Sequence, residues 1–208
     1  MTLTLVEAIA LAGGLLNATA FLLYNRNIFV VDYGTRPNAA SYVLWTVVLA
    51  VNLLTYRAMN NNWTIFVVMA TDTTLCVVTA FFLWLTGKFG ALNKRDWQVM
   101  LLGVVAVVVW QTSNATYGNF TAQVPMALAF LPTIRVVKEG SSLEDPRVWW
   151  LFVASFATSV INACLQWRGQ PEDLTSPIVG LVMHAVVLAY AIRGRRLFGN
   201  RRAESIIG

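Results

Sequence analysis

Long apolar stretches separated by short polar connections dominate this sequence and restrict it to one kind of fold. A helix needs roughly 20 apolar residues to cross a bilayer, and lipid-exposed backbone must satisfy its own hydrogen bonds. Hydropathy predicts spans at residues 4–24, 39–57, 63–86, 97–117, 120–137, 148–167 and 176–193. Only 12% of the 208 residues are charged, whereas about 25% is usual in soluble domains. The sequence therefore predicts an all-α membrane protein with seven transmembrane helices.

Basic residues are distributed unevenly between the connections, and this predicts an orientation in the membrane. Seven spans put the two chain ends on opposite faces. Connections on the N-terminal side hold only Arg57 and Arg168, and the other side holds the rest of the 15 lysines and arginines. Cytoplasmic loops of membrane proteins carry an excess of Lys and Arg. We therefore expect a multipass protein of the cell (inner) membrane, with the N-terminus outside and the C-terminus in the cytoplasm.

The C-terminal segment, residues 195–208, is predicted to be a basic cytoplasmic tail. Its arginines act either as an ordinary topology anchor or as a site for anionic lipid or a partner. The net charge of +5 is explained by this topology. We therefore expect the chain to contact the lipid bilayer and not nucleic acid.

Two neighbouring spans in the first half resemble two in the second half, which predicts an internal repeat. Each first member opens with a proline, has aromatic residues early and carries an asparagine about four turns further on. The matched positions are Pro37 with Pro146, Asn52 with Asn162 and Asp72 with His184. At a helical rise of about 1.5 Å per residue, the last pair lies near the middle of the membrane.

The predicted organisation is three helices, one linker helix and three helices. It assigns residues 1–87 to the first three-helix repeat, 88–118 to the linker helix and 119–194 to the second repeat. A single linker helix restores the original direction across the membrane, so the two repeats are parallel. Parallel repeats about an axis along the membrane normal are a known transporter plan, with the binding site at the repeat interface near midplane.

The arrangement resembles the SWEET and PQ-loop superfamily, to which the bacterial nicotinamide riboside transporters are structurally related. The resemblance is carried by the segment LPTIRVVKEGSS, residues 131–142, and by the following helix, which ends in VIN. A proline near the cytoplasmic end of a helix, then a basic loop, then a helix with early aromatic residues is similar to that family's second repeat. The chain departs from the family at Leu22 and Leu23, where the first-repeat proline is missing, and at Thr133, which replaces glutamine. The resemblance implies transport of a small solute.

Asp72 is the first candidate for a functional residue because it lies in the middle of an apolar span. A charge at a span centre costs roughly 2.5–3.5 kcal/mol on insertion scales. We expect hydrogen bonds to it from its neighbours Thr71, Thr73 and Thr74. The carboxylate either accepts a hydrogen bond from a solute or carries a proton, and the alternative is a structural carboxylate satisfied by neighbouring helices.

His184 is the only histidine in the chain. Alone on an apolar helix it would be interpreted as a packing residue, but the repeat aligns it with Asp72 and places the two residues across the repeat axis from each other. A carboxylate and a histidine are too few for a zinc site, which needs three or four protein ligands. We therefore expect neither a metal nor a cofactor.

Asn52, Asn162 and Trp45 complete the predicted substrate-binding set, and Pro132 is the predicted hinge. SWEET-type transporters bind solute with paired asparagines and tryptophans from the third helix of each repeat, whereas Asn52 and Asn162 lie on the second helix. The asparagines either bind solute or join helices. Trp45 either stacks on a solute or packs in the core. Pro132 bends the fifth span, as a hinge or as a fixed shape.

The sequence excludes several classes of function. All three lysines lie outside the seventh span, so no retinal Schiff base can form there, and the chain lacks phosphate-loop, HExxH, CxxC and nucleophile-elbow motifs. We expect a non-enzymatic transporter or facilitator for a polar small solute, such as a sugar, nucleoside or vitamin-like molecule. The alternative is a non-transporting membrane subunit or scaffold of a larger membrane complex. The sequence leaves open whether the protein forms a homo-oligomer.

Overall fold

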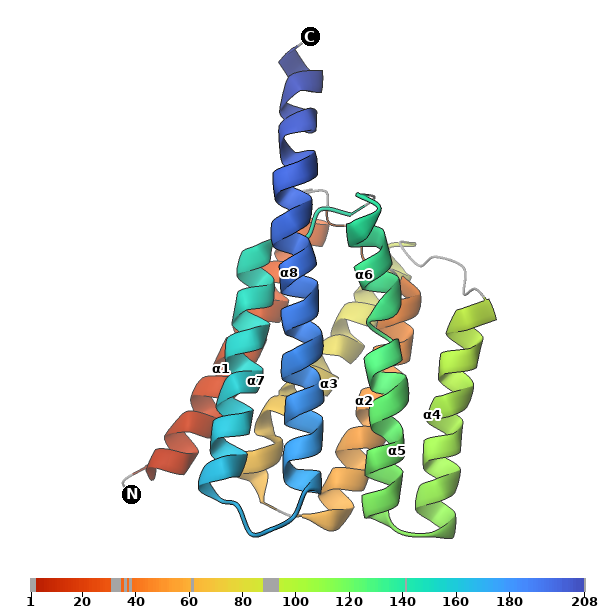
Figure 1. The fold of residues 1–208 in the computed structure, drawn as a ribbon, viewed down its shortest axis with the longest axis vertical. Coiled ribbons are helices and arrows are strands. Elements are labelled where there is room, and N and C mark those ends of the chain that lie inside the picture. The colour runs from red at the N-terminus through yellow and green to blue at the C-terminus, as the bar shows by residue number, and fades with distance from the viewer. Residues whose placement is uncertain are drawn as a thin grey trace.

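The computed structural model describes residues 3–30, 35, 37, 39–60, 62–87, 94–140 and 142–207. Every regular element within these ranges is an α-helix. The helices are α1 (Leu5–Phe29), α2 (Ala39–Met59), α3 (Trp63–Leu85), α4 (Lys94–Thr112), α5 (Ala115–Leu128), α6 (Leu131–Lys138), α7 (Pro146–Leu165) and α8 (Glu172–Ile207). Figure 1 shows the two chain ends at opposite ends of the bundle.

Six helical stretches of the described chain are long and apolar enough to cross a membrane. They are Leu5–Phe29, Ser41–Met59, Trp63–Leu85, Ala115–Lys138, Pro146–Leu165 and Glu172–Arg195. The predicted fourth span corresponds to a shorter apolar helix, Met100–Thr112. The all-helical fold is confirmed, and the six spans support a membrane protein, while the count of seven crossings stays a prediction.

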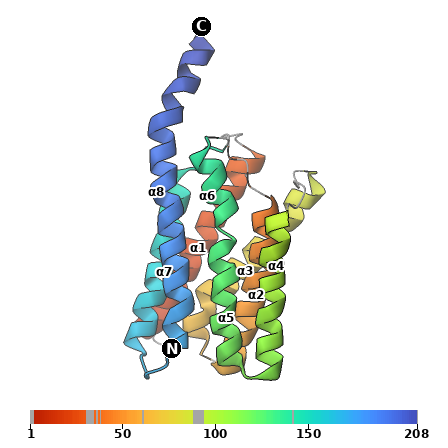
Figure 2. The ribbon, with the colours of Figure 1, turned by 45° about the vertical axis from the view of Figure 1, so that its right-hand side comes forward.

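The helices surround a common centre. α1 packs against α3 and α7, and α2 packs against α3 and α5, while α8 packs against α5, α6 and α7. These contacts close a ring in the order α1, α3, α2, α5 with α6, α8 and α7 (Figure 1). Helix α4 lies outside the ring, where it contacts α2 and α5 (Figure 2).

Several helices begin at a polar side chain that caps their free backbone N–H groups. The capping side chains are Thr4 for α1, Asn62 for α3, Asn114 for α5 and Asp145 for α7. Thr4 and Glu7 form a reciprocal capping box. The polar connections between the apolar stretches therefore fix where these helices start.

The helical column of α5 and α6 is interrupted at Ala129 and Phe130, immediately before Pro132. Pro132 has no N–H, and its ring would clash with the carbonyl of Leu128 in a continuous helix. Pro125 lies one turn earlier, inside α5. The helix is therefore interrupted where the sequence places the bend, and its use as a hinge stays a prediction.

The helix bounds differ from the predicted spans in two informative places. α5 begins at Ala115, not near residue 120, because Asn114 caps it after a turn of only two residues. α8 continues to Ile207, so the segment 195–208 predicted as a tail extends the last span as helix up to residue 207. α8 projects beyond the bundle in both views (Figures 1 and 2).

Candidate functional site

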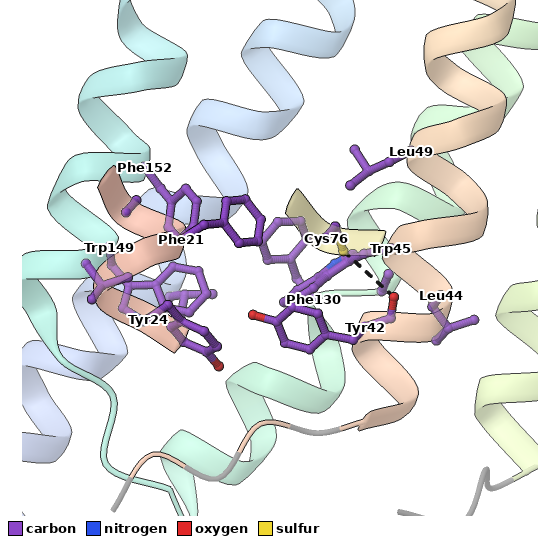
Figure 3. Packing of buried hydrophobic residues seen from close by; sticks show 14 of the residues in the cluster. Phe21, Tyr24, Tyr42, Leu44, Trp45, Leu49, Cys76, Phe130, Trp149 and Phe152 are labelled. Carbon is purple, nitrogen blue, oxygen red and sulfur yellow. Dashed lines mark hydrogen bonds between the residues drawn. The ribbon is translucent and has the colours of Figure 1, made fainter. Parts of the chain in front are cut away.

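A small cavity lies at the centre of the ring, and aromatic rings form most of its wall. The rings belong to Phe21, Tyr42, Trp45, Phe130, Trp149 and Phe152. They come from α1, α2, α7 and the break between α5 and α6, and Figure 3 shows them converging on one space. The cavity volume is about 20 Å³. A water molecule needs roughly 10–15 Å³ of such space, so the cavity has room for about one water molecule.

Asp72 lines this cavity from α3 and is only 4% exposed. Its Oδ1 accepts a hydrogen bond of 3.3 Å from Nδ2 of Asn17 on α1. The predicted hydrogen bonds from neighbouring threonines to Asp72 are wrong. The hydroxyl groups of Thr71, Thr73 and Thr74 donate instead to the backbone carbonyls four residues earlier in their own helix. A threonine on a helix reaches that carbonyl more easily than the side chain of its neighbour. Asp72 thus depends on a different helix for its only hydrogen bond among the described residues.

His184 lines the same cavity from α8 and is 5% exposed. Its Nδ1 lies 2.7 Å from the backbone oxygen of Gly180. Because a carbonyl can only accept, Nδ1 carries the proton in the neutral ring and Nε2 is left as an acceptor. The Phe156 ring stacks on the imidazole at 4.7 Å. Gly180 makes this stacking possible, since a Cβ at that position would overlap the Phe156 ring.

Asp72 and His184 therefore share one cavity from opposite sides of the ring. Among the described residues there is no hydrogen bond or ion pair between them. The sequence alignment places the two residues across the repeat axis, and both line this cavity without direct contact.

Trp45 also lines the cavity, as a substrate-binding role requires. Its ring packs against Tyr42 at 5.1 Å and Phe130 at 4.9 Å. Its Nε1 is buried and has no hydrogen-bond partner among the described residues. A buried donor without a partner costs about 1–3 kcal/mol, so this N–H is available to an acceptor that enters the cavity.

Asn52 lies outside the cavity lining, in a buried polar cluster on α2, α5 and α8. Its Nδ2 donates to Ser176 Oγ at 2.7 Å. Its Oδ1 accepts from Asn119 Nδ2 at 2.7 Å and from Gln123 Nε2 at 2.9 Å. Asn162 is also outside the lining, and its Nδ2 donates to the Thr64 backbone oxygen at 2.5 Å. Each asparagine joins helices from different parts of the ring.

Further hydrogen bonds connect the helices at the N-terminal end of the bundle, where α2, α3, α7 and α8 meet. Tyr56 Oη donates to Asp173 Oδ1 at 2.7 Å, and Asn60 Nδ2 donates to the same oxygen at 3.2 Å. Asn62 Nδ2 donates to Gln166 Oε1 at 2.6 Å. Both Tyr56 and Asp173 are buried. Polar side chains thus close the bundle between the cavity and this end.

Another buried carboxylate, Glu144, lies at the opposite end of the bundle in the connection before α7. It is 2% exposed and accepts hydrogen bonds from Ser142 Oγ at 3.0 Å and Trp149 Nε1 at 3.1 Å. Burial raises the pKa of Glu144 from its ordinary value of 4.5 to about 7, and hydrogen bonds with Trp149 and Ser142 oppose the rise. Trp149 also lines the cavity, so Glu144 holds one wall of it.

Glu144 was missed by sequence reasoning because the segment EGSSLEDPR resembles an ordinary polar connection. The adjacent Asp145 has the capping role that such a segment predicts. Asn27 Nδ2, on α1, donates to Asp145 Oδ2 at 3.4 Å and helps to bury the connection. No group of three or more metal-ligating side chains occurs within the part of the chain that the structure describes.

The fold and the site define an all-helical protein with membrane-spanning composition and an aromatic cavity that contains a buried carboxylate and an imidazole. Comparison with known proteins found no family model, no curated protein and no solved structure that matches this chain.

Proposed function

We propose that this protein is a small membrane transporter or facilitator whose solute binds in the central cavity, between two three-helix units. The observation that carries the proposal is the position of Asp72 and His184. They line one buried cavity, from α3 and α8 respectively. A polar residue deep in a membrane span is expensive and typically marks a solute or ion pathway.

The packing order supports two equivalent units. In the first unit α3 lies between α1 and α2, and in the second α8 lies between α7 and the α5–α6 column. In both, the third helix packs between the first two. α4 packs outside the ring, as a linker between the units would. The proposed 3+1+3 organisation would place the cavity on the axis that relates the units.

Two hydrogen bonds at the N-terminal end also support the repeat. The sequence alignment carries Asn52 to Asn162 and, at the offset of 112 that relates Asp72 to His184, it carries Thr64 to Ser176. Asn52 is hydrogen-bonded to Ser176, and Asn162 is hydrogen-bonded to Thr64. In both bonds, the asparagine of one unit is the donor and the aligned Thr or Ser position of the other unit is the acceptor. A proposed two-fold relation explains both bonds, which independent packing would not.

The cavity is closed toward both ends, as an occluded state of a transporter would be. Tyr56 with Asp173 joins the units at the N-terminal end, and Asn27 with Asp145 joins them at the opposite end. A typical hydrogen bond contributes only about 0.5–1.5 kcal/mol net. Either set could therefore separate while the other holds, and the break before Pro132 would allow the α5–α6 column to bend. We place the N-terminal end outside and the opposite end in the cytoplasm of the cell (inner) membrane.

The test is solute uptake into proteoliposomes that contain the purified protein. Pools of labelled sugars, nucleosides, vitamins and amines are compared in vesicles with the wild type, with Asp72→Asn and with Val104→Ala. Val104 is 55% exposed on α4, outside the ring, and so serves as the control. We expect uptake by the wild type and Val104→Ala, and its loss or reduction in Asp72→Asn. Absence of uptake for every pool, with purification inside a larger assembly, would support the scaffold alternative instead.

A further inference from the structure

The chemistry of the cavity wall narrows the solute class. Six aromatic rings and one carboxylate line it, and none of the described lining residues is a lysine or arginine. Aromatic faces carry partial negative charge and attract cations. A sugar, in contrast, would bury many hydroxyl groups, and each one left without a hydrogen bond is costly. The wall offers few polar groups for that purpose, chiefly Asp72, His184 and the Trp45 indole.

No side chain among the described residues places a positive charge beside Asp72. Its hydrogen-bond donor, Asn17, is neutral, and Asp72 takes no part in the ion pairs of Arg135 with Glu139 and of Arg147 with Asp145. A carboxylate this deeply buried is stable only when it is protonated or when a cation lies beside it. A proton and a cation therefore compete for the same group.

We infer that the cavity, which in this closed structure has room for about one water molecule, enlarges to bind a small organic monocation of the substituted-ammonium class, and that this cation displaces a proton from Asp72. The inference rests on the proposed function and adds its substrate class and its coupling. When the cation enters, the proton leaves an Asp72 oxygen for the solvent on the side to which the cavity is open. When the cation leaves, a proton returns. Alternation between the two faces would exchange one proton for one cation.

The other groups around Asp72 are compatible with this exchange. The titratable side chains that share its cavity are Tyr42 on α2, Cys76 on α3 and His184 on α8. α1, α5, the break and α7 contribute neutral side chains to the wall. The Trp45 N–H is buried and has no partner in the described part of the chain, so it offers one hydrogen bond to a hydroxyl oxygen. Choline carries one such group and tetramethylammonium carries none, so the pair tests this donor.

Calorimetry on the purified, detergent-solubilised protein tests the inference. Tetramethylammonium, choline and glucose are titrated at pH 6 and pH 8, with sodium chloride at equal ionic strength as the blank. Each titration is repeated in two buffers of different ionisation enthalpy, which reports the protons released per cation bound. We expect saturable binding of both cations, tighter at pH 8, with up to one proton released and no binding of glucose.

Two variants complete the design. Asp72→Asn removes the carboxylate, and we expect at least a tenfold loss of cation affinity and no proton release. Glu139→Gln removes an exposed carboxylate of the same charge and should leave both quantities unchanged. Wild-type binding that is independent of pH, without proton release, overturns the inference even if Asp72→Asn fails to fold. Binding of glucose but not of the cations also overturns it.

The outcomes separate this inference from the proposed transport function. Cation binding with proton release but no uptake into proteoliposomes would support the site and contradict the transporter. Uptake of a neutral sugar without cation binding would support the transporter and contradict the cation site.

Discussion

Glu144 gives a prediction whose size follows from the structure. Burial raises its pKa from 4.5 to about 7, and a pKa difference of one is worth roughly 1.4 kcal/mol. The full effect on the free energy of unfolding is therefore about 3 kcal/mol. Since the folded state holds the proton more tightly than the unfolded state, its stability is greatest below pH 4.5 and falls as the pH rises through 7. Of the total, about 2.5 kcal/mol is lost between pH 5 and pH 8.

The substitution Glu144→Gln removes the ionisable carboxyl group. It keeps an oxygen that can accept the hydrogen bond from the Trp149 indole N–H. We expect the variant to be as stable as the wild type near pH 5 and more stable at pH 8. For a chain of this length, 1 kcal/mol corresponds to about 2–4 °C in Tm, so the gap between the two proteins should widen by roughly 5–10 °C.

Thermal unfolding in detergent at several pH values measures this gap. Glu139→Gln is the control, because Glu139 is exposed and its removal should leave the pH dependence of the wild type unchanged. Parallel curves for the wild type and Glu144→Gln from pH 5 to pH 8 would refute the reasoning, since they would mean that Glu144 is solvated or ionised at no cost.

Two further substitutions test the packing around the cavity and its closure at the N-terminal end. Gly180→Ala places a methyl group where it overlaps the Phe156 ring, so we expect a loss of about 1–3 kcal/mol in the free energy of unfolding. Gly103→Ala is the control, because a methyl group there meets only ordinary contacts and should be tolerated. Equal Tm values for the two variants would contradict the packing. Tyr56→Phe removes the hydrogen bond to buried Asp173 and should cost about 1–3 kcal/mol in chemical denaturation, and an unchanged midpoint would contradict its role.

Much of the architecture could be predicted from local patterns. Long apolar stretches predict spans whatever surrounds them, and Pro132 interrupts its helix for a reason that lies within its own backbone. The alignment of Asp72 with His184 also agrees with the cavity they share. Their functional role stays a prediction, because geometry alone does not show what enters the cavity.

The partners of the polar residues could not be predicted, because each depends on contacts between helices distant in sequence. Asp72 accepts a hydrogen bond from Asn17 on another helix, and not from the neighbouring threonines on its own helix. The sequence alignment pairs Asn52 with Asn162 as solute ligands, yet both lie outside the cavity lining and join helices. Glu144 is buried in a connection that is hydrogen-bonded to α1, where Asn27 donates to the adjacent Asp145. Sequence periodicity does not encode such contacts.

The most direct test of the account uses Cys76, which lines the cavity and is 1% exposed. The chain has two cysteines, and Cys164 is exposed, so Cys164→Ala leaves Cys76 as the only thiol. A small, membrane-impermeant, cationic thiol reagent is applied to either face of sealed vesicles that hold the protein in one orientation. The account predicts slow modification of Cys76 from both faces, with protection by choline. Modification from one face alone, or from neither until the protein is unfolded, would contradict a cavity that opens alternately to the two sides.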